Sequence, residues 1–313
     1  DTIDGWFRHP LLRAFFYGFP SYGGQSYHAK APGALTIPYF MLTDGVYWPV
    51  GPDGEGIAAI PAAYARLAED LGIHIECGAR VEGIRNDSSR VTHVTVGGKD
   101  LPFDAVISNR DRFTAAAWTG ESESREPSYS YFTLHWGETV RRAGLKHHTL
   151  LIPENFAAGF DALYERREFP DPPIVYLNDT TATDPPVAPP GGTNLFAVVT
   201  CPAKEPHLDW SDPTPFRAAV ARTMAACGQP MPESVAFERI QTPNTFEERD
   251  GSYRGSLYGL DERHRILGGS FPPGVRDETI RNLFYCGGAV QPGAGLPMVT
   301  LSGRFAAAAL KQA

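Results

Sequence analysis

The C-terminal segment of the chain most constrains how it can fold. A buried strand at 282–286 runs into Gly287 and Gly288, then into an irregular loop, and then into an alanine-rich helix at 298–310. Two glycines directly after a strand let another group approach the backbone closely. The free N–H groups and the positive dipole end of the helix face the same place. The pattern is that of a cradle for the electron-rich edge of a planar cofactor, with a plain strand-to-helix turn as the alternative.

Hydrophobic periodicity divides the rest of the chain into two parts with different patterns. The first part is predicted to form helices at 7–18 and at 57–71, and Gly72 ends the helix at 57–71. The same part is predicted to form strands at 45–50, 73–77 and 103–108 and a hairpin at 81–96. From about residue 128, predicted strands alternate with loops rich in Pro and Gly. These strands lie at 129–136, 149–153, 174–178 and 195–201, and helices are predicted at 156–167 and 214–227. We expect an α/β part and a mostly antiparallel part.

Charge and composition exclude several classes of protein. The 313 residues carry 28 Lys and Arg against 36 Asp and Glu, a net charge of −8, with no basic run, which argues against nucleic acid as a partner. No apolar stretch approaches the length of a transmembrane helix. The four cysteines form no C-x-x-C pair and predict buried free thiols in a reducing, cytoplasmic compartment.

Common catalytic and metal motifs are absent from the sequence. There is no H-E-x-x-H, no G-x-S-x-G and no G-x-x-x-x-G-K-[ST]. His147 and His148 are adjacent, but neighbours on a strand point to opposite faces and are poorly placed to share a metal ion. We therefore expect no metal site.

The segment Leu283–Val299 resembles the C-terminal signature of the bacterial carotenoid desaturases. These are FAD-dependent oxidoreductases of the phytoene desaturase type, related to the amine oxidases. The turn at 45–56 with the helix after it, and FDAVISNRD at 103–111, are similar to further parts of the family pattern. Tyr131–Trp136, His147–His148 and Asp184–Phe196 look most like members that desaturate hydroxylated or otherwise modified carotenoids. The resemblance covers essentially the whole chain.

The resemblance implies a mixed α/β and α+β fold. An incomplete FAD-binding, Rossmann-like domain of the glutathione-reductase-2 type is expected beside a substrate domain with a mostly antiparallel sheet and helices. Residues 1–44 would belong to the substrate or helical domain, 45–118 and 276–313 to the FAD domain, and 119–275 to the substrate domain.

The resemblance also implies which residues bind FAD. The main chain at Val81 is expected to contact the adenine, and Gly287, Gly288 and Ala289 to lie along the ribityl chain and pyrophosphate. The start of the last helix is expected to face the pyrimidine end of the isoalloxazine through Gly295, Leu296, Pro297, Met298 and Val299. A tunnel for a long polyene would draw on an aromatic set made of Phe15, Phe16, Tyr17, Tyr39, Phe40, Tyr131, Phe132 and Trp136. No catalytic base is assigned.

One departure from the family pattern is serious. The glycine loop G-x-G-x-x-G, which holds the pyrophosphate of FAD, is missing, and Gly51, Gly54 and Gly56 have the wrong spacing. Asp1 stands where the middle of a family member is expected. We therefore expect the chain to lack the N-terminal third of a longer protein, and FAD to be bound weakly or to be absent from this chain alone.

The expected reaction is oxidation of a C–C single bond of a polyene to C=C, with hydride transfer to flavin. A carotenoid substrate implies peripheral contact with the inner face of the membrane, while the oligomeric state and the particular carotenoid are not specified. Three alternatives remain open. They are a flavin-dependent carotenoid isomerase, an amine-oxidase-like enzyme, and a non-catalytic polyene-binding or scaffold domain without FAD.

Overall fold

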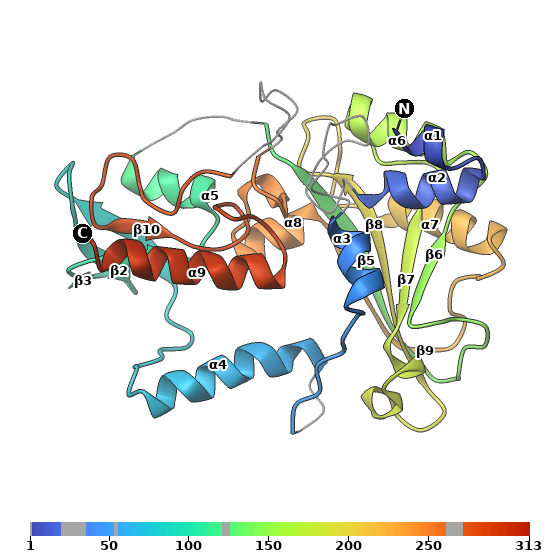
Figure 1. Cartoon of the computed structure of the whole chain (residues 1–313), viewed down its shortest axis with the longest axis horizontal. Helices are drawn as coiled ribbons and strands as arrows, with labels where there is room; N and C mark the ends of the chain where they lie inside the picture. Colours follow the sequence, from blue (N-terminus) through green and yellow to red (C-terminus); the bar gives the residue numbers. More distant parts are fainter. Residues whose placement is uncertain (1, 20–35, 53–55, 121–125, 261–271) are drawn as a thin grey trace.

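A five-stranded antiparallel sheet dominates the computed structural model, which describes residues 2–19, 36–52, 56–120, 126–260 and 272–313 (Figure 1). The strand order is β6-β7-β8-β5-β9. The strands are β5 (Tyr129–Glu138), β6 (His148–Leu151), β7 (Val175–Asp179), β8 (Thr193–Pro202) and β9 (Val235–Gln241). β5 and β8 pair along their whole length, from Tyr129 opposite Pro202 to Glu138 opposite Thr193.

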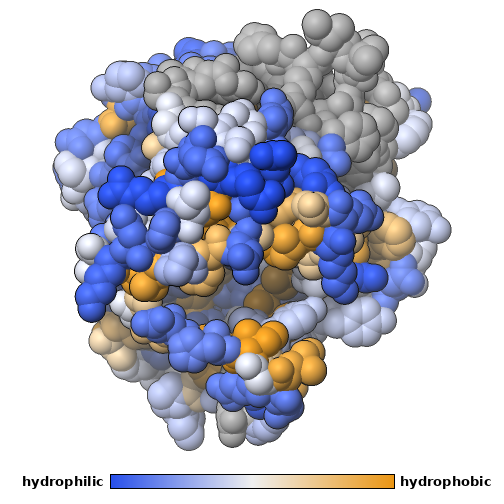
Figure 2. Space-filling view, turned by 90° about the vertical axis from the view of Figure 1, so that its left-hand side faces the viewer, coloured by the Kyte–Doolittle hydropathy of each residue, from blue (hydrophilic) through white to orange (hydrophobic). Residues whose placement is uncertain are grey.

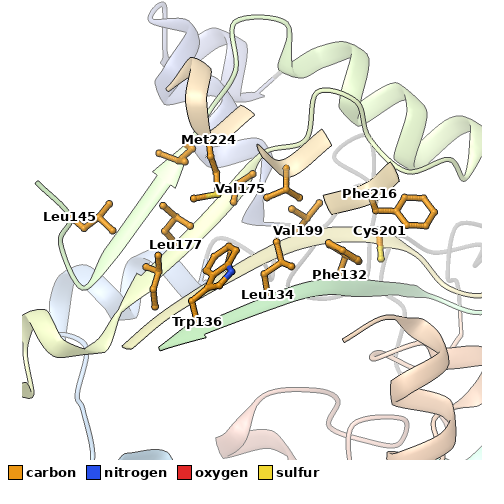
Figure 3. Packing of buried hydrophobic residues seen from close by; sticks show 14 of the residues in the cluster. Phe132, Leu134, Trp136, Leu145, Val175, Leu177, Val199, Cys201, Phe216 and Met224 are labelled. Carbon is orange, nitrogen blue, oxygen red and sulfur yellow. The ribbon is translucent and has the colours of Figure 1, made fainter. Parts of the chain in front are cut away.

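One face of this sheet forms the main hydrophobic core, which we call the core face. Successive side chains on a strand point to opposite faces, so alternate residues share this side. They pack against α7 (Thr214–Ala226) through Phe216, Val220 and Met224. Figure 3 shows the core-face side chains pointing to the same side of the strands, among them Phe132, Leu134, Trp136, Val175, Leu177 and Val199.

The opposite face of the sheet is covered in part by two helices near the N-terminus and in the middle of the chain. They are α2 (Pro10–Tyr17), which follows the short α1 (Thr2–Trp6), and α6 (Phe156–Arg166). Tyr129 on this face meets Tyr164 of α6 edge to face, with ring centroids 4.9 Å apart. We call this side of the sheet the cavity face.

A smaller α/β unit lies beside the large sheet. β4 (Val106–Ser108) and β10 (Leu283–Tyr285) form a parallel pair, and α9 (Leu296–Leu310) packs Ala306 and Ala309 on Phe284 of β10. A three-stranded antiparallel sheet of β1 (Val81–Asn86), β2 (Val91–Val96) and β3 (Lys99–Pro102) adjoins this pair. The short helix α5 (Arg112–Ala116) completes this region, and another short helix, α8 (Pro243–Thr245), follows β9 and contacts β5 of the large sheet.

Asn282 fastens the three-stranded sheet to the parallel pair. Its Oδ1 accepts a hydrogen bond from the Val91 N–H (2.6 Å), and its Nδ2 donates to the carbonyls of Val91 (3.0 Å) and Asp104 (2.6 Å). The residue is only 3% exposed, so no solvent replaces these bonds if the amide is removed.

Helix α4 (Ala59–Asp70) stands apart from both sheets in Figure 1. It ends as expected, with Gly72 in the left-handed region at φ +73°. None of its residues is buried, and the apolar side chains on and around it are exposed, namely Ile57, Tyr64, Leu67, Leu71, Ile73 and Ile75. Figure 2 faces the side that carries α4 and shows apolar side chains gathered around a hollow there. The helix is amphipathic, but its apolar face has no packing partner among the described residues.

Most elements predicted from the periodicity are confirmed, and several expectations are wrong. Residues 73–77 and 45–50 are not strands, because no neighbouring strand among the described residues pairs with them. The expected strand at 103–108 is reduced to β4, and Ile107 on it is 39% exposed. β9 and α3 (Thr36–Thr43) were not expected as regular elements. Cys77 is exposed rather than buried. Residues 53–55 of the expected turn at 45–56 lie outside the described residues. The division into segments 1–44, 45–118, 119–275 and 276–313 stays a prediction.

Replacing Asn282 by Ala tests its role as a fastening. The change strips hydrogen bonds from both backbone groups of the buried Val91 and from the carbonyl of Asp104, so we expect a loss of about 3 kcal/mol in the free energy of unfolding. Asn155→Ala, at an exposed position whose side chain makes no capping bond, serves as the control and should change stability little. Urea denaturation of both variants measures the difference, and equal stabilities would contradict the assignment.

Helices α4 and α7 have similar lengths but opposite environments. Since α7 buries five residues and α4 buries none, the amide protons of α4 should exchange with deuterium much faster than those of α7. Hydrogen–deuterium exchange followed by mass spectrometry measures this contrast. Equal protection of the two helices would show that α4 has a packing partner in solution.

Candidate functional site

Hydrogen bonds from its backbone N–H groups fix the glycine turn after β10 to its surroundings. The Cys286 N–H donates to the Ser108 carbonyl (2.9 Å), which extends the parallel pairing by one residue. The Gly287 N–H donates to Ser302 Oγ of α9 (2.8 Å), and this hydroxyl in turn donates to the Val299 carbonyl (2.6 Å). Gly287 has φ +112°, and a Cβ there would lie 2.9 Å from Asn109 Oδ1. Only glycine fits this position without strain.

The start of α9 presents an apolar surface with uncapped N–H donors. Gly295 occupies the N-cap with φ +106°, no side chain caps the helix, and no atom lies within 4 Å of where its Cβ would be. Pro297 has no N–H, so the donors of the first turn are the amides of Leu296 and Met298. The side chains of these two residues are 48% and 40% exposed. The arrangement suits a flat heterocycle with carbonyl oxygens at its edge.

The predicted cofactor residues fall into two places. Gly287, Gly288, Ala289, Gly295, Leu296, Pro297, Met298 and Val299 lie together in the turn and the first turn of α9. Val81 instead begins β1 and pairs with Val96 in the three-stranded sheet. The roles of these residues in binding FAD stay predictions.

A loop at 256–260 joins the glycine turn to the large sheet. A Cβ on Gly259, which has φ +75°, would lie 3.3 Å from the Cβ of Ala289. The Gly259 carbonyl accepts a hydrogen bond from the Ser128 N–H (2.9 Å), and the Leu257 N–H donates to the Tyr129 carbonyl (3.1 Å). The beginning of β5 is therefore held against the glycine turn.

An apolar cavity of about 360 Å³ lies between the cavity face and helices α2 and α6. Its volume is within the range of small-molecule pockets. From the helices, the lining includes Ala14, Phe15, Phe160 and Leu163; from the sheet, it includes Tyr131, Leu150, Tyr176, Phe196, Val198 and Thr200. None of the described residues that line the cavity is ionised at neutral pH, so the cavity favours an uncharged ligand.

Two residues of the aromatic set expected in a tunnel lie in the wall of this cavity. Phe15 and Tyr131 line the cavity. Phe132 and Trp136 do not, because the alternation of β5 places them on the core face. Tyr39 and Phe40 are exposed on α3, and Phe16 stacks on Phe7.

Several cavity residues were missed from the sequence. Phe160 and Tyr164 come from α6, and Tyr176, Phe196 and Thr200 come from β7 and β8. The signal was present in β8, where Phe196, Val198 and Thr200 alternate with the core residues Leu195, Ala197 and Val199. The sequence predicted a strand at 195–201 but not which of its two apolar faces would line a cavity.

A pair of tyrosines connects the cavity with the glycine turn. The hydroxyl of Tyr131, in the cavity wall, lies 2.5 Å from the hydroxyl of Tyr258, and either one can donate the hydrogen bond. Tyr258 directly precedes Gly259, which packs on Ala289. One end of the cavity thus lies next to the predicted cofactor turn.

Burial shifts the pKa values of two ionisable groups near the turn in the direction of their neutral forms. Burial raises the pKa of the Cys286 thiol, so it stays protonated beside Asn109, 3.7 Å from its Oδ1. Burial also raises the pKa of Asp111, although the N–H groups of Phe113 and Thr114 oppose the shift by donating to its carboxyl. Among the described residues, no cluster of three His, Cys, Asp or Glu could hold a metal ion.

Comparison with known proteins identifies relatives at the level of sequence. The chain is 33% identical over 315 residues to a zeta-carotene-forming phytoene desaturase of Myxococcus xanthus, an alignment that covers 97% of this chain. It is 29% identical to a 4,4'-diaponeurosporene oxygenase of Staphylococcus aureus, again over 97% of this chain. The chain spans 60% and 63% of the lengths of these two relatives. No family model matches the sequence.

Solved structures share the fold. An oxidoreductase from Methanosarcina mazei superposes with a TM-score of 0.61 at 13% identity, over 99% of this chain and 68% of the other. Cyclohexylamine oxidase from Brevibacterium oxydans gives a TM-score of 0.51 at 11% identity, over 99% of this chain and 66% of the other. The expected fold class, with an α/β part and a mostly antiparallel part, is confirmed. The sequence matches confirm the resemblance stated above: over most of its length this chain is similar to a phytoene desaturase and to a 4,4'-diaponeurosporene oxygenase.

Proposed function

We propose that this chain supplies the substrate cavity and the flavin-facing turn of an FAD-dependent carotenoid desaturase. The observation that carries the proposal is the apolar cavity, whose Tyr131 end is tied through Tyr258 and Gly259 to the glycine turn. An uncharged, apolar cavity beside a cofactor cradle suits oxidation of a long hydrocarbon chain. The homology to a phytoene desaturase supports the same conclusion.

The residues at the start of α9 fit a flavin. The open space at Gly295, the exposed side chains of Leu296 and Met298 and the uncapped amides give an apolar platform with donors at its edge. FAD, when bound, supplies a hydride acceptor for the reaction. No G-x-G-x-x-G loop accompanies this platform in the 313 residues, so the platform holds the ring end of the cofactor and not the pyrophosphate.

The cavity contributes orientation and the exclusion of water. Phe15, Phe160 and Phe196 supply flat apolar walls against which a rigid polyene can lie. The described lining offers no carboxylate or amine as a base, so the proton that leaves with each hydride is accepted outside these residues. The Tyr131–Tyr258 pair places two hydrogen-bonded phenol hydroxyls at the junction of cavity and turn.

A carotenoid substrate dissolved in lipid implies that the protein meets the inner face of the membrane from the cytoplasm, and we propose this location on the basis of the substrate alone. No helix in the described ranges is both long and apolar enough to cross a bilayer.

The complete gene product that contains these residues is the material for the test. Purified under anaerobic conditions, it should be yellow, and adding an acyclic carotenoid in detergent should bleach the visible flavin band. The product should absorb at longer wavelength, because its conjugated system is longer.

Other outcomes of the same experiment would contradict desaturation. Bleaching by amines alone would indicate an amine oxidase. A product that contains oxygen would favour the reaction named for the Staphylococcus relative. A changed double-bond geometry without a net gain of conjugation would indicate an isomerase, and a colourless protein would indicate a scaffold.

Met298→Glu tests the flavin platform in the same gene product. Met298 is exposed, and an acidic residue in the first turn of a helix stabilises the helix, so loss of fold cannot account for an effect. A carboxylate facing the electron-rich edge of the ring should weaken flavin binding by about tenfold. Leu310→Glu, at the exposed far end of α9, is the control and should leave the flavin dissociation constant unchanged.

A further inference from the structure

Arg110 places a positive charge at the edge where the two parallel strands end. It follows the last residue of β4 by two positions, as Gly287 follows the last residue of β10 by two positions. The carboxyl ends of neighbouring parallel strands meet at one edge of a sheet, and ligands of α/β folds bind outside this edge. Asn109 connects the two positions, because its Oδ1 would lie 2.9 Å from a Cβ on Gly287. Arg110 is therefore adjacent to the glycine turn, outside the cavity described above.

The guanidinium of Arg110 is held in place without a counterion. It lies over the Trp118 ring, 5.0 Å from the centroid, and a Cβ on Gly251 would lie 2.5 Å from its Nη1. Its Nε is buried and donates no hydrogen bond, whereas its Nη groups keep contact with solvent. No carboxylate in the described part of the chain forms an ion pair with it. The carboxyl of the neighbouring Asp111 instead caps α5, where it accepts hydrogen bonds from two backbone N–H groups.

A second arginine adds to the positive charge at this place. Arg80 is exposed and directly precedes Val81, the first residue of β1. Burial and, after it, the charge of Arg80 lower the pKa of Arg110, so the two guanidinium groups lie close enough to repel each other. Arg80 also forms no ion pair with a carboxylate of the described ranges. Two neighbouring cations without a counterion are unfavourable, and an anion bound between them would remove the repulsion.

We propose that Arg110 and Arg80 form a binding site for a phosphate or diphosphate anion. The guanidinium of Arg110 is planar and fixed over an aromatic ring, and such a group offers paired N–H donors in the geometry of phosphate oxygens. Arg80, on an exposed and longer-reaching side chain, supplies a second charge. The 313 residues hold no G-x-G-x-x-G loop, so this site is built from charged side chains and not from a glycine loop.

The anion has two possible sources, the diphosphate of a dinucleotide cofactor and a separate phosphate compound. The position of the arginines favours the first source. Arg80 adjoins Val81, which is predicted to lie at the adenine, and Arg110 is next to the glycine turn, which is predicted to lie along the other half of the cofactor. A diphosphate joins these two halves in a dinucleotide. This choice of source rests on the proposed function, whereas the site itself does not.

The alternative is that Arg110 serves packing alone, as a cation over the Trp118 ring. The two interpretations predict different results for Arg110→Met, which keeps a long side chain over the ring and removes the charge. A packing residue would make this variant less stable and leave anion binding unchanged. A binding residue makes the variant at least as stable as the unaltered protein, because the repulsion from Arg80 is gone, while its affinity for phosphate falls.

The test titrates inorganic pyrophosphate into the complete gene product, freed of flavin, at constant ionic strength, and calorimetry gives the dissociation constant. Arg110→Met should weaken binding about tenfold, the scale of one charge-assisted hydrogen bond. Arg80→Gln should weaken it less, because that side chain is exposed. Arg90→Gln removes the same charge at the exposed far end of the β1–β2 hairpin and is the matched control, with affinity unchanged. Urea denaturation of each variant measures stability.

The same titration on protein saturated with FAD identifies the source of the anion. Loss of pyrophosphate binding, with a weaker affinity of Arg110→Met for FAD but not for riboflavin, assigns the site to the diphosphate of the dinucleotide. Binding that persists and still depends on Arg110 assigns it to a separate phosphate compound. No binding by the unaltered protein, equal affinities of the unaltered protein and Arg110→Met, or an equal loss in Arg90→Gln would overturn the inference. None of these results depends on oxidation of a carotenoid, so the desaturase proposal stands or falls separately.

Discussion

The pairing of β5 with β8 is the interaction on which the rest of the structure depends. Ten residues of each strand are matched without interruption, and the side chains alternate between the two faces. One set builds the core with α7, and the other builds a wall of the cavity. Burial of the core face stabilises the sheet. Because stability does not depend on the cavity face to the same degree, the side chains of that face can be suited to a ligand.

The glycine turn depends on this sheet through a short chain of contacts. The loop at 256–260 is bound to the start of β5 and packs Gly259 on Ala289. Ser302 binds the backbone of Gly287 from α9, and a side chain at Gly287 would meet Asn109. The position of the turn is therefore set by elements far apart in the sequence, although its shape is encoded locally by glycines.

The sequence predicted four of the five strands of the large sheet, all but β9, and the glycine turn, because these leave short-range signals. Alternation marks β5, β7 and β8, and the glycines mark the turn. The face of the sheet on which each aromatic residue lies was not predictable. Tyr131 and Phe132 are neighbours in the sequence, but Tyr131 lines the cavity and Phe132 lies in the core. The expected strand at 73–77 failed for a physical reason, because a strand forms only where another strand pairs with it. The roles of Val81 and of the turn in binding FAD remain predictions.

The neighbourhood of His148 and Asn178 could not be predicted from the sequence, because only the register between β6 and β7 places these two residues opposite each other. The same register limits how related proteins can diverge. One residue inserted at the start of β8, before Leu195, would move every later side chain of the strand to the other face, so that Phe196 and Val198 would enter the core and Leu195 and Val199 would line the cavity. Insertions and deletions among relatives should therefore fall in the loops between these strands. Changes of substrate preference should arise by substitution at alternate positions, with strand length conserved.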